Sequence, residues 1–438
     1  MTGSHSSPIP WGKPLSIESK RQVDQLRARF AKNEIPSSYD TDFNLYRWII
    51  NVERTQKTKS ANDVIDQSEK GLRNHVVYRK LLKLDDDSIP SWDKNPMFTS
   101  RTIPQGKLSD KPDRLNRIMW YIEYRSLKFE LIVNKLRTTE MAMYQFWLYE
   151  IMLRRVNEQE RETGRLSSIH HVTDMAGMAI SPFTMLFVSN GQMAYFAHLM
   201  HYEHYPELVS PTHMCNCPRW MTIPYRLIRG MMPTGFTDRF KLHDSRHTEG
   251  LLQEIDADNL PDYLGGENCE LASVPADPEY AQKYADDAIK ESESSANDVD
   301  DENICDEHRL AVTIHARRRK IIPVEVQQRN TRLFWHFNTD ADVYFGVFRH
   351  RLDDTDIETD HTSEGALAKL EIEKLEMVHP WFKLGAKLVA EADNVLCTEP
   401  GFYYLIFCNR HSWLQRRNVH LKVDLHTQPY RIERTLSL

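Results

Sequence analysis

Cysteine is scarce in this sequence, and no secretory leader is recognisable. The six cysteines are scattered along 438 residues, which is too sparse for a disulfide framework. Cys215 and Cys217 are separated by one residue, a spacing that zinc fingers do not use, and we interpret both as buried thiols. The first residues, MTGSHSSPIPWGKP, contain no apolar stretch. These absences favour a cytoplasmic protein.

An excess of positive charge is also lacking. The formal net charge of -7 argues against nonspecific nucleic-acid binding, which draws most of its energy from cationic contacts to phosphate. Hydrophobic residues at 40% and charged residues at 27% are ordinary for a soluble globular protein. A length of 438 residues exceeds what one core normally organises, so we expect several domains.

The segment 175–202 contains no Asp, Glu, Lys or Arg, which raises the alternative of a membrane-spanning helix. Ser181, Pro182 and Asn190 interrupt it, whereas a spanning helix needs about 20 mainly apolar residues. Polar groups at these positions would lack partners in hydrocarbon unless neighbouring helices supplied them. We therefore interpret the segment as apolar chain buried inside a soluble fold.

The spacing of apolar residues divides the chain into four regions. Residues 15–90 carry apolar side chains at helical spacing, so we expect an N-terminal all-α lobe. Residues 91–266 alternate short apolar runs with longer helical ones, which is typical of an α/β domain with a mostly parallel sheet. Residues 267–310 are rich in Asp, Glu and Ser and predict an acidic linker. Residues 311–426 contain short aromatic and β-branched runs between turn residues, which predicts a C-terminal all-β sandwich.

Familiar catalytic motifs are missing. The sequence contains no G-x-S-x-G elbow, P-loop, dinucleotide fingerprint or H-E-x-x-H, so we expect a non-enzymatic protein without a metal or a cofactor. His198, His201 and His204 offer the alternative of a metal site, but a spacing of three rotates by about 60° per step around a helix. The basic run at 317–320 is either a solvated surface or a contact for acidic lipid headgroups.

An ordered series of motifs in the middle of the chain resembles the CRAL-TRIO family, which includes secretory phosphatidylinositol transfer proteins and supernatant protein factor. YPE at 205–207 resembles the end of a family helix, and NCP at 216–218 resembles the end of a strand. VTDMAGM at 172–178 is similar to a strand that ends in Asp-x-x-Gly, and LPDYLGG at 260–266 is similar to the close of the domain. The resemblance implies a sheet and surrounding helices that enclose one hydrophobic lipid beneath a gate helix.

The implied lipid pocket needs an apolar wall and few polar groups. The residues that we expect to line it are Trp120, His171, Met178, Phe183, Met185, Tyr195 and Phe196. Each of them has the alternative of filling the core between sheet and helices. Residues 219–232 correspond to the gate helix, whose apolar face would cover the lipid when closed and rest in the membrane interface when open. That face consists of Trp220, Ile223, Leu227, Ile228 and Met231.

Two positions carry the prediction for the lipid headgroup. The resemblance implies that phosphoinositide-binding members use the Glu of the YPE motif and a Lys of a later strand, which correspond to Glu207 and Arg239 here. Ile169 and His171 stand where a phosphatidylcholine-binding member uses Ser and Thr, which disfavours that lipid. We therefore expect phosphatidylinositol or a neutral isoprenoid lipid.

The C-terminal segment resembles the GOLD domain, a β-sandwich found beside CRAL-TRIO domains and in trafficking proteins. The runs DVYFGVFR, CTEPGFYYLIFCNRHSW and VHLKVDL follow its order. Arg410, Arg416 and Arg417 are expected to be exposed and to meet acidic partners or headgroups. Together the resemblances imply a lipid-transfer or lipid-sensing protein with transient peripheral membrane association. The alternative is a trafficking or signalling adaptor that acts mainly through protein partners of the GOLD domain.

Overall fold

The chain forms two compact units in the computed structural model. The first unit consists of Met1–Phe129 and Gln145–Ala281, and the second unit consists of Glu130–Tyr144 and Gln282–Leu438. Each unit is described by itself. The residues that the structure describes are 9–55, 60–86, 101–179, 191–218, 222, 239–243, 245–277, 279, 310–350 and 361–427. Most of the predicted acidic linker and residues 180–190 of the uncharged segment lie outside them.

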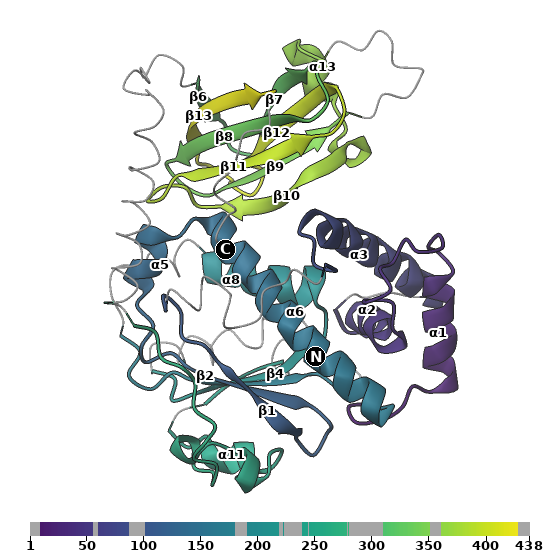
Figure 1. Ribbon diagram of the computed structural model, residues 1–438, viewed down its shortest axis with the longest axis vertical. Helices are drawn as coiled ribbons and strands as arrows, with labels where there is room; N and C mark the ends of the chain where they lie inside the picture. The colour runs from purple at the N-terminus through teal and green to yellow at the C-terminus, as the bar shows by residue number, and fades with distance from the viewer. Residues whose placement is uncertain are drawn as a thin grey trace. The chain divides into compact units, whose positions relative to one another are not determined.

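Three helices form the N-terminal part of the first unit, as predicted (Figure 1). They are α1 (Ile17–Arg27), α2 (Asp42–Thr55) and α3 (Ala61–Leu81). Ser16 and Ser60 cap α1 and α3, because their side-chain oxygens accept hydrogen bonds from backbone N–H groups three residues later, at 3.0 and 3.2 Å. Gly71 of α3 lets the ring of Trp48 approach closely, since a Cβ at this position would lie 2.7 Å from that ring. The apolar faces of the three helices therefore meet in one core.

A five-stranded sheet forms the centre of the first unit. Its strands are β1 (Lys107–Pro112), β2 (Ile118–Glu123), β3 (Ile169–Asp174), β4 (Val209–Cys215) and β5 (Phe240–Leu242). They lie in the order β1-β2-β3-β4-β5, and only the β1–β2 pair is antiparallel. The mostly parallel α/β sheet is confirmed by these pairings, and helices separate β2 from β3 and β3 from β4 in the sequence.

Helical segments cover both faces of this sheet, and Figure 1 shows α6 and α11 on opposite sides of it. The bounds are α6 (Thr138–Thr163), α8 (Gln192–His198), the π-helix η2 (Leu199–His204), α11 (Thr248–Leu252), η4 (Ala257–Asn259) and η5 (Asp262–Leu264). On one face, α11 and the segment after it bury Leu251, Ile255 and Leu260 against Met119 and Val172. No helix among the described residues is long and apolar enough to cross a membrane.

The second unit contains two antiparallel four-stranded sheets. Their strands are β6 (Leu310–Ile314), β7 (Arg319–Val326), β8 (Thr331–Thr339), β9 (Val343–Arg349), β10 (Glu376–Leu384), β11 (Glu391–Cys397), β12 (Gly401–Cys408) and β13 (Arg417–His426). The orders are β10-β9-β12-β7 and β11-β8-β13-β6. Phe337 of one sheet contacts Phe345 and Phe407 of the other, with ring centroids 4.8 and 5.0 Å apart. The sheets therefore pack face to face, and the predicted all-β architecture is confirmed.

Short helical segments complete the second unit. They are α5 (Phe129–Lys135), the first residues of α6, α13 (Glu364–Lys369) and η7 (Ile372–Lys374). Glu391 of β11 is buried and accepts hydrogen bonds from the backbone N–H and the hydroxyl of Thr139, at 3.2 and 2.6 Å. The guanidinium of Arg137 donates to the carbonyl of Ala392. These contacts fasten the segment 130–144 to the C-terminal strands.

Candidate functional site

A transverse row of four residues crosses the sheet of the first unit. Trp120 pairs with His171, His171 pairs with Thr212, and Thr212 pairs with Phe240 in the strand register. Because neighbours in a parallel register share a face, these side chains lie opposite the apolar cluster that contains Met119. We call these four residues the sheet row. Trp120 and Thr212 are buried, whereas His171 and Phe240 are half-buried.

Side chains from α6 and η2 cover the sheet row. The ring of His201 meets the ring of Phe240 edge to face, with centroids 5.1 Å apart. The Nε2 atom of His201 lies 3.1 Å from the hydroxyl of Tyr149 on α6. Burial lowers the pKa of His201 well below its usual range, with Arg239 and His171 adding to this effect, so the imidazole is neutral.

The two residues predicted for the headgroup form a buried ion pair. The Nη2 atom of Arg239 lies 2.5 Å from Oε1 of Glu207, and the side chains are 2% and 1% exposed. Arg54, in the last turn of α2, places its Nε atom 3.7 Å from the same oxygen. The guanidinium carbon of Arg239 also lies 4.5 Å from the centroid of the Tyr202 ring. The contributions of Arg54 and Tyr202 were not predictable from the sequence, because neither residue belongs to a recognised motif.

Several polar atoms of the Glu207–Arg239 pair form no hydrogen bond within the described part of the chain. Among the described residues, Oε2 of Glu207 and the Nε and Nη1 atoms of Arg239 have no hydrogen-bond partner, although all three are buried. The Oγ1 atom of Thr212 in the sheet row is buried without a partner as well. A buried donor or acceptor without a partner costs about 1–3 kcal/mol. The arrangement therefore has polar positions that a ligand can satisfy.

Three of the predicted pocket residues that the structure describes lie near the two ends of the uncharged segment 175–202. Tyr195 and Phe196 of α8 are buried, with ring centroids 5.6 Å apart, and Met178 is half-buried in the turn after β3. Phe183 and Met185 lie outside the described residues. So do all five gate residues: Trp220, Ile223, Leu227, Ile228 and Met231. The roles in pocket and gate stay predictions.

The motifs that carry the resemblance meet at the carboxyl ends of β3 and β4. Asp174 accepts hydrogen bonds from the side-chain amide of Asn216 at 2.7 Å and from the backbone N–H of Ala176 at 2.9 Å. Gly177 adopts a φ of 70°, a left-handed conformation that glycine tolerates best. Asp-x-x-Gly and Asn-x-Pro therefore fix the turn after β3 against the end of β4.

The three histidines considered for metal binding face different partners. His198 lies 3.1 Å from Glu203, His201 lies beside Tyr149, and Nδ1 of His204 lies 3.3 Å from Nδ1 of His75 on α3. Their nitrogens do not converge on one point.

A different set on the opposite face of the sheet has the geometry of metal ligands. One ligand atom each from His170, His213 and Glu254 lie within 4.8 Å of one another. Both oxygens of Glu254 already accept hydrogen bonds, at 2.6 Å from Arg117 and at 2.8 Å from Lys241. These two cations hold the pKa of Glu254 down at about 2 against the effect of burial. These three residues are far apart in the sequence, so no local motif predicts that they come together.

Known families and proteins match most of the chain. Residues 108–266 match the CRAL/TRIO domain family, and residues 15–87 match a domain of unknown function, DUF8435. CRAL-TRIO domain-containing protein F28H7.8 of Caenorhabditis elegans is 23% identical over 411 residues, covering 92% of this chain and 89% of the relative. Protein ctg-1 of the same organism is 21% identical over 408 residues, covering 92% and 96%.

Two shorter or weaker similarities accompany these matches. Sec14 cytosolic factor of Schizosaccharomyces pombe is 28% identical over 137 residues, covering 30% of this chain and 46% of the relative. The crystal structure of Sfh5 aligns with a TM-score of 0.39 and 15% identity, covering 63% of this chain and 99% of that one. The GOLD resemblance of the C-terminal sheets stays a prediction. The family match therefore identifies residues 108–266, which hold strands β2 to β5, as similar to the CRAL/TRIO domain.

Proposed function

We propose that this protein carries or senses one hydrophobic lipid, with the headgroup at the pair Glu207–Arg239 and the apolar part along the sheet row. Phosphatidylinositol is the favoured ligand, ahead of a neutral isoprenoid lipid. The protein works in the cytoplasm without catalysing a reaction, and it meets membranes transiently. Residues 219–232 act as the gate that opens at the membrane and closes over the lipid.

The charge balance around Glu207 carries the preference for an anionic headgroup. Arg54 and Arg239 both approach this single carboxylate. The neighbouring His171 stays neutral, because burial lowers its pKa to about 4. Burial also raises the pKa of Tyr149, so its hydroxyl stays protonated. Two guanidinium groups therefore lie near one buried carboxylate, an arrangement that favours an added anionic group.

A phosphate group would fit the surroundings of the Glu207–Arg239 pair for two reasons. It supplies negative charge, and its oxygens accept hydrogen bonds from guanidinium atoms that lack partners among the described residues, Nε and Nη1 of Arg239. The planar guanidinium donates two parallel hydrogen bonds to a phosphate, which the Lys expected from the family pattern cannot do. The carboxylate of Glu207 in turn accepts hydrogen bonds from inositol hydroxyls through Oε2, which has no partner in the described part of the chain.

The test combines lipid content with lipid transfer. Native mass spectrometry of the purified full chain, followed by lipid extraction, measures whether one lipid is bound per chain. Transfer of fluorescent phosphatidylinositol and of a tocopherol between vesicles then measures selectivity. The variant Glu207→Gln/Arg239→Gln keeps a polar side chain at both positions but removes both charges, and we expect phosphatidylinositol transfer to fall at least about tenfold, because charge-assisted hydrogen bonds contribute roughly 1.5–3 kcal/mol.

A second buried ion pair provides the matched control. Arg47 and Glu160 are each 3% exposed and join α2 to α6. If Arg47→Gln/Glu160→Gln lost phosphatidylinositol to the same degree, general destabilisation would account for the effect. Undiminished transfer by the Glu207/Arg239 variant would exclude the headgroup role and favour a neutral lipid. A wild-type chain that is always purified empty and transfers neither lipid would favour the adaptor alternative.

A further inference from the structure

A basic cavity opens on the surface of the second unit. Its volume is about 340 Å³, and it is lined by Arg317, Arg318, Arg319, Lys320, Ile321, Leu367, Ala368 and Arg410. We call this the basic cavity. Five of the eight lining residues are cations and none is an acid. Its floor is apolar, because Ile321 and Leu367 belong to the buried cluster beneath α13.

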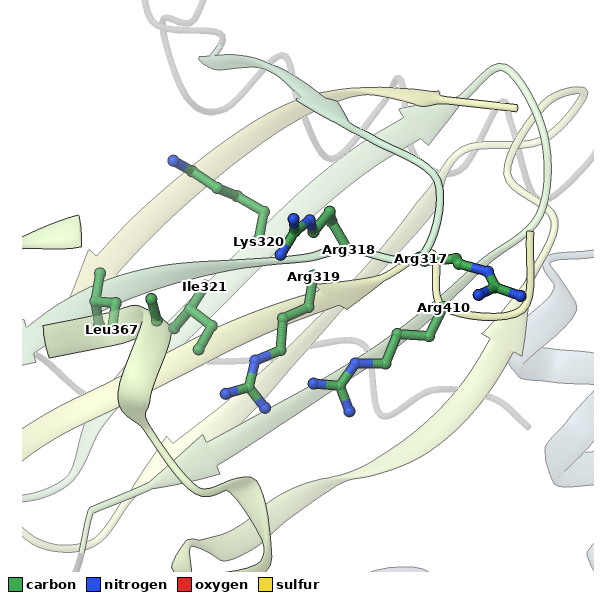
Figure 2. A pocket seen from close by; sticks show the side chains of 8 residues that line it. Arg317, Arg318, Arg319, Lys320, Ile321, Leu367 and Arg410 are labelled. Carbon is green, nitrogen blue, oxygen red and sulfur yellow. The ribbon is translucent and has the colours of Figure 1, made fainter. Parts of the chain in front are cut away.

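The arginines of this cavity lie close to one another. Figure 2 shows Arg319 and Arg410 extending next to each other from β7 and from the end of β12. Burial lowers the pKa of Arg319, and the nearby charge of Arg410 lowers it further. Arg319 is held in place because its guanidinium donates to the carbonyl of Leu370. Within the described residues, Arg317, Arg318, Arg319 and Arg410 form no ion pair, whereas Arg329 of the same unit pairs with Glu399 at 2.8 Å.

An apolar tip stands beside the basic cavity. Trp413 is 75% exposed and Leu414 is 92% exposed, both in the loop between β12 and β13. The guanidinium carbon of Arg317 lies 3.5 Å from the centroid of the Trp413 ring, so the cavity and the tip are in contact. A tryptophan and a leucine displayed together at a loop end are unfavourable in water and suit the interface of a lipid bilayer.

The loop that displays this tip is held by hydrogen bonds. Asn409 is fully buried, and its side-chain amide donates to the carbonyls of Ile314 and Gln415 at 3.1 and 2.8 Å. Its backbone exchanges hydrogen bonds with Arg317 and Arg318, at 3.0 and 2.8 Å. The loop and the turn between β6 and β7 therefore form one structure, which keeps the exposed pair next to the cations.

The structure corrects the expectation that Arg417 is exposed. Arg417 is buried, and its guanidinium binds Asp342 at 3.1 Å, so it is not part of the exposed basic surface. Arg410 and Arg416 are exposed as expected.

We infer that the basic cavity and the apolar tip together form a docking surface for an anionic membrane, with a lipid phosphate in the cavity and Trp413 and Leu414 in the interface. Charge complementarity selects this partner, because the chain as a whole has a net charge of -7 and would otherwise be repelled by an anionic bilayer. The inference goes beyond the proposed function, since it concerns the second unit and does not require a lipid in the CRAL-TRIO domain.

Vesicle co-sedimentation of the full chain tests this surface. The vesicles contain phosphatidylcholine alone, or phosphatidylcholine with about one-fifth phosphatidylserine, which gives a negative surface potential. We expect clear binding only to the second kind, and weaker binding as salt is raised. The variant Arg319→Gln/Arg410→Gln should weaken binding about 30-fold, because each cation near such a surface contributes roughly 1 kcal/mol. The variant Trp413→Ser/Leu414→Ser should weaken it by at least about tenfold.

Matched substitutions on the same unit serve as controls. Arg329→Gln removes an exposed cation elsewhere on the unit, and Leu396→Ser removes another exposed apolar side chain, 43% exposed. Both should bind vesicles like the wild type. Equal binding to the two kinds of vesicle, or unchanged binding by both double variants, would refute the inference. The inference would also be refuted if a soluble inositol phosphate bound in the cavity while the same chain did not bind anionic vesicles. Native mass spectrometry distinguishes the docking surface from the proposed carrier function. If a chain that does not bind vesicles still contains a bound lipid, only the docking surface is refuted.

Discussion

Acid should destabilise the first unit well above the pH at which carboxylates titrate, because the unit buries neutral histidines. His75, His201, His204 and His213 are between 0% and 5% exposed. Burial lowers the pKa of His204 to about 4 and the pKa values of His75 and His213 well below the usual range, as it does for His201. Neighbouring charge adds to this for three of them, from Arg79 beside His75, from Arg239 beside His201 and from Lys241 beside His213.

The sign and the size follow from proton linkage. An imidazole whose pKa is lowered on folding binds a proton more readily when unfolded, so its contribution to stability is present above the unfolded pKa of about 6.5 and is lost as the pH falls below it. At pH 5.5 each such histidine reduces the free energy of unfolding by about 1.4 kcal/mol relative to neutral pH. Four of them amount to about 6 kcal/mol, which approaches the roughly 5–15 kcal/mol that stabilises a typical protein. Burial raises the pKa of Glu160, which acts in the opposite direction as the pH falls.

Urea titrations at about pH 7.5, 6.5 and 5.5 measure this loss. Hydrogen exchange of peptides from 60–86 and 191–218, which carry all four histidines, assigns the transition to the first unit. His204→Gln should reduce the proton uptake on unfolding by about one, and His420→Gln, at an exposed position, should leave it unchanged. A free energy of unfolding that changed by less than about 1 kcal/mol across this range would refute the reasoning.

Two further predictions concern packing in the first unit. Glu150→Gln should destabilise it by about 1.5–3 kcal/mol in urea titrations, because the buried guanidinium of Arg79 loses the carboxylate that it binds at 2.6 Å and keeps only its pair with Asp85. Gly71→Ala should lower the melting temperature, since the new methyl group would lie 2.7 Å from the ring of Trp48, at a typical overpacking penalty of about 1–3 kcal/mol. Gly365→Ala is its control, because no atom lies within 4 Å of the corresponding Cβ.

The sequence allowed the order of elements to be predicted, because that information is local. Apolar periodicity identified the N-terminal helices and the parallel strands, and the motif that contains Asp174 and the motif that contains Asn216 marked two strand ends that meet in space. The all-β character of the C-terminal region followed from alternating aromatic and β-branched residues such as those of β12. These patterns depend on neighbours only a few residues away.

Long-range partners were not predictable in the same way. Glu207 and Arg239 were paired through the resemblance, but nothing local marks Arg54, which joins them from more than 150 positions upstream. The contact between Arg317 and Trp413 likewise depends on two loops brought together by strand pairing. Burial determines the protonation of the histidines, and a sequence alone does not specify how much water surrounds each ring.

The attachment of residues 130–144 to the second unit has a consequence for how the chain is made. Thr139 leaves the ribosome 252 residues before Glu391, the buried carboxylate that it binds. The second unit therefore cannot complete its structure until translation is nearly finished. Until then, residues 130–144 lack their partners while the remaining strands of the first unit are synthesised. Cutting the gene at the acidic linker yields two fragments, neither of which corresponds to a folding unit. Expression of residues 311–426 together with a separate peptide covering 130–144 would restore the missing partners.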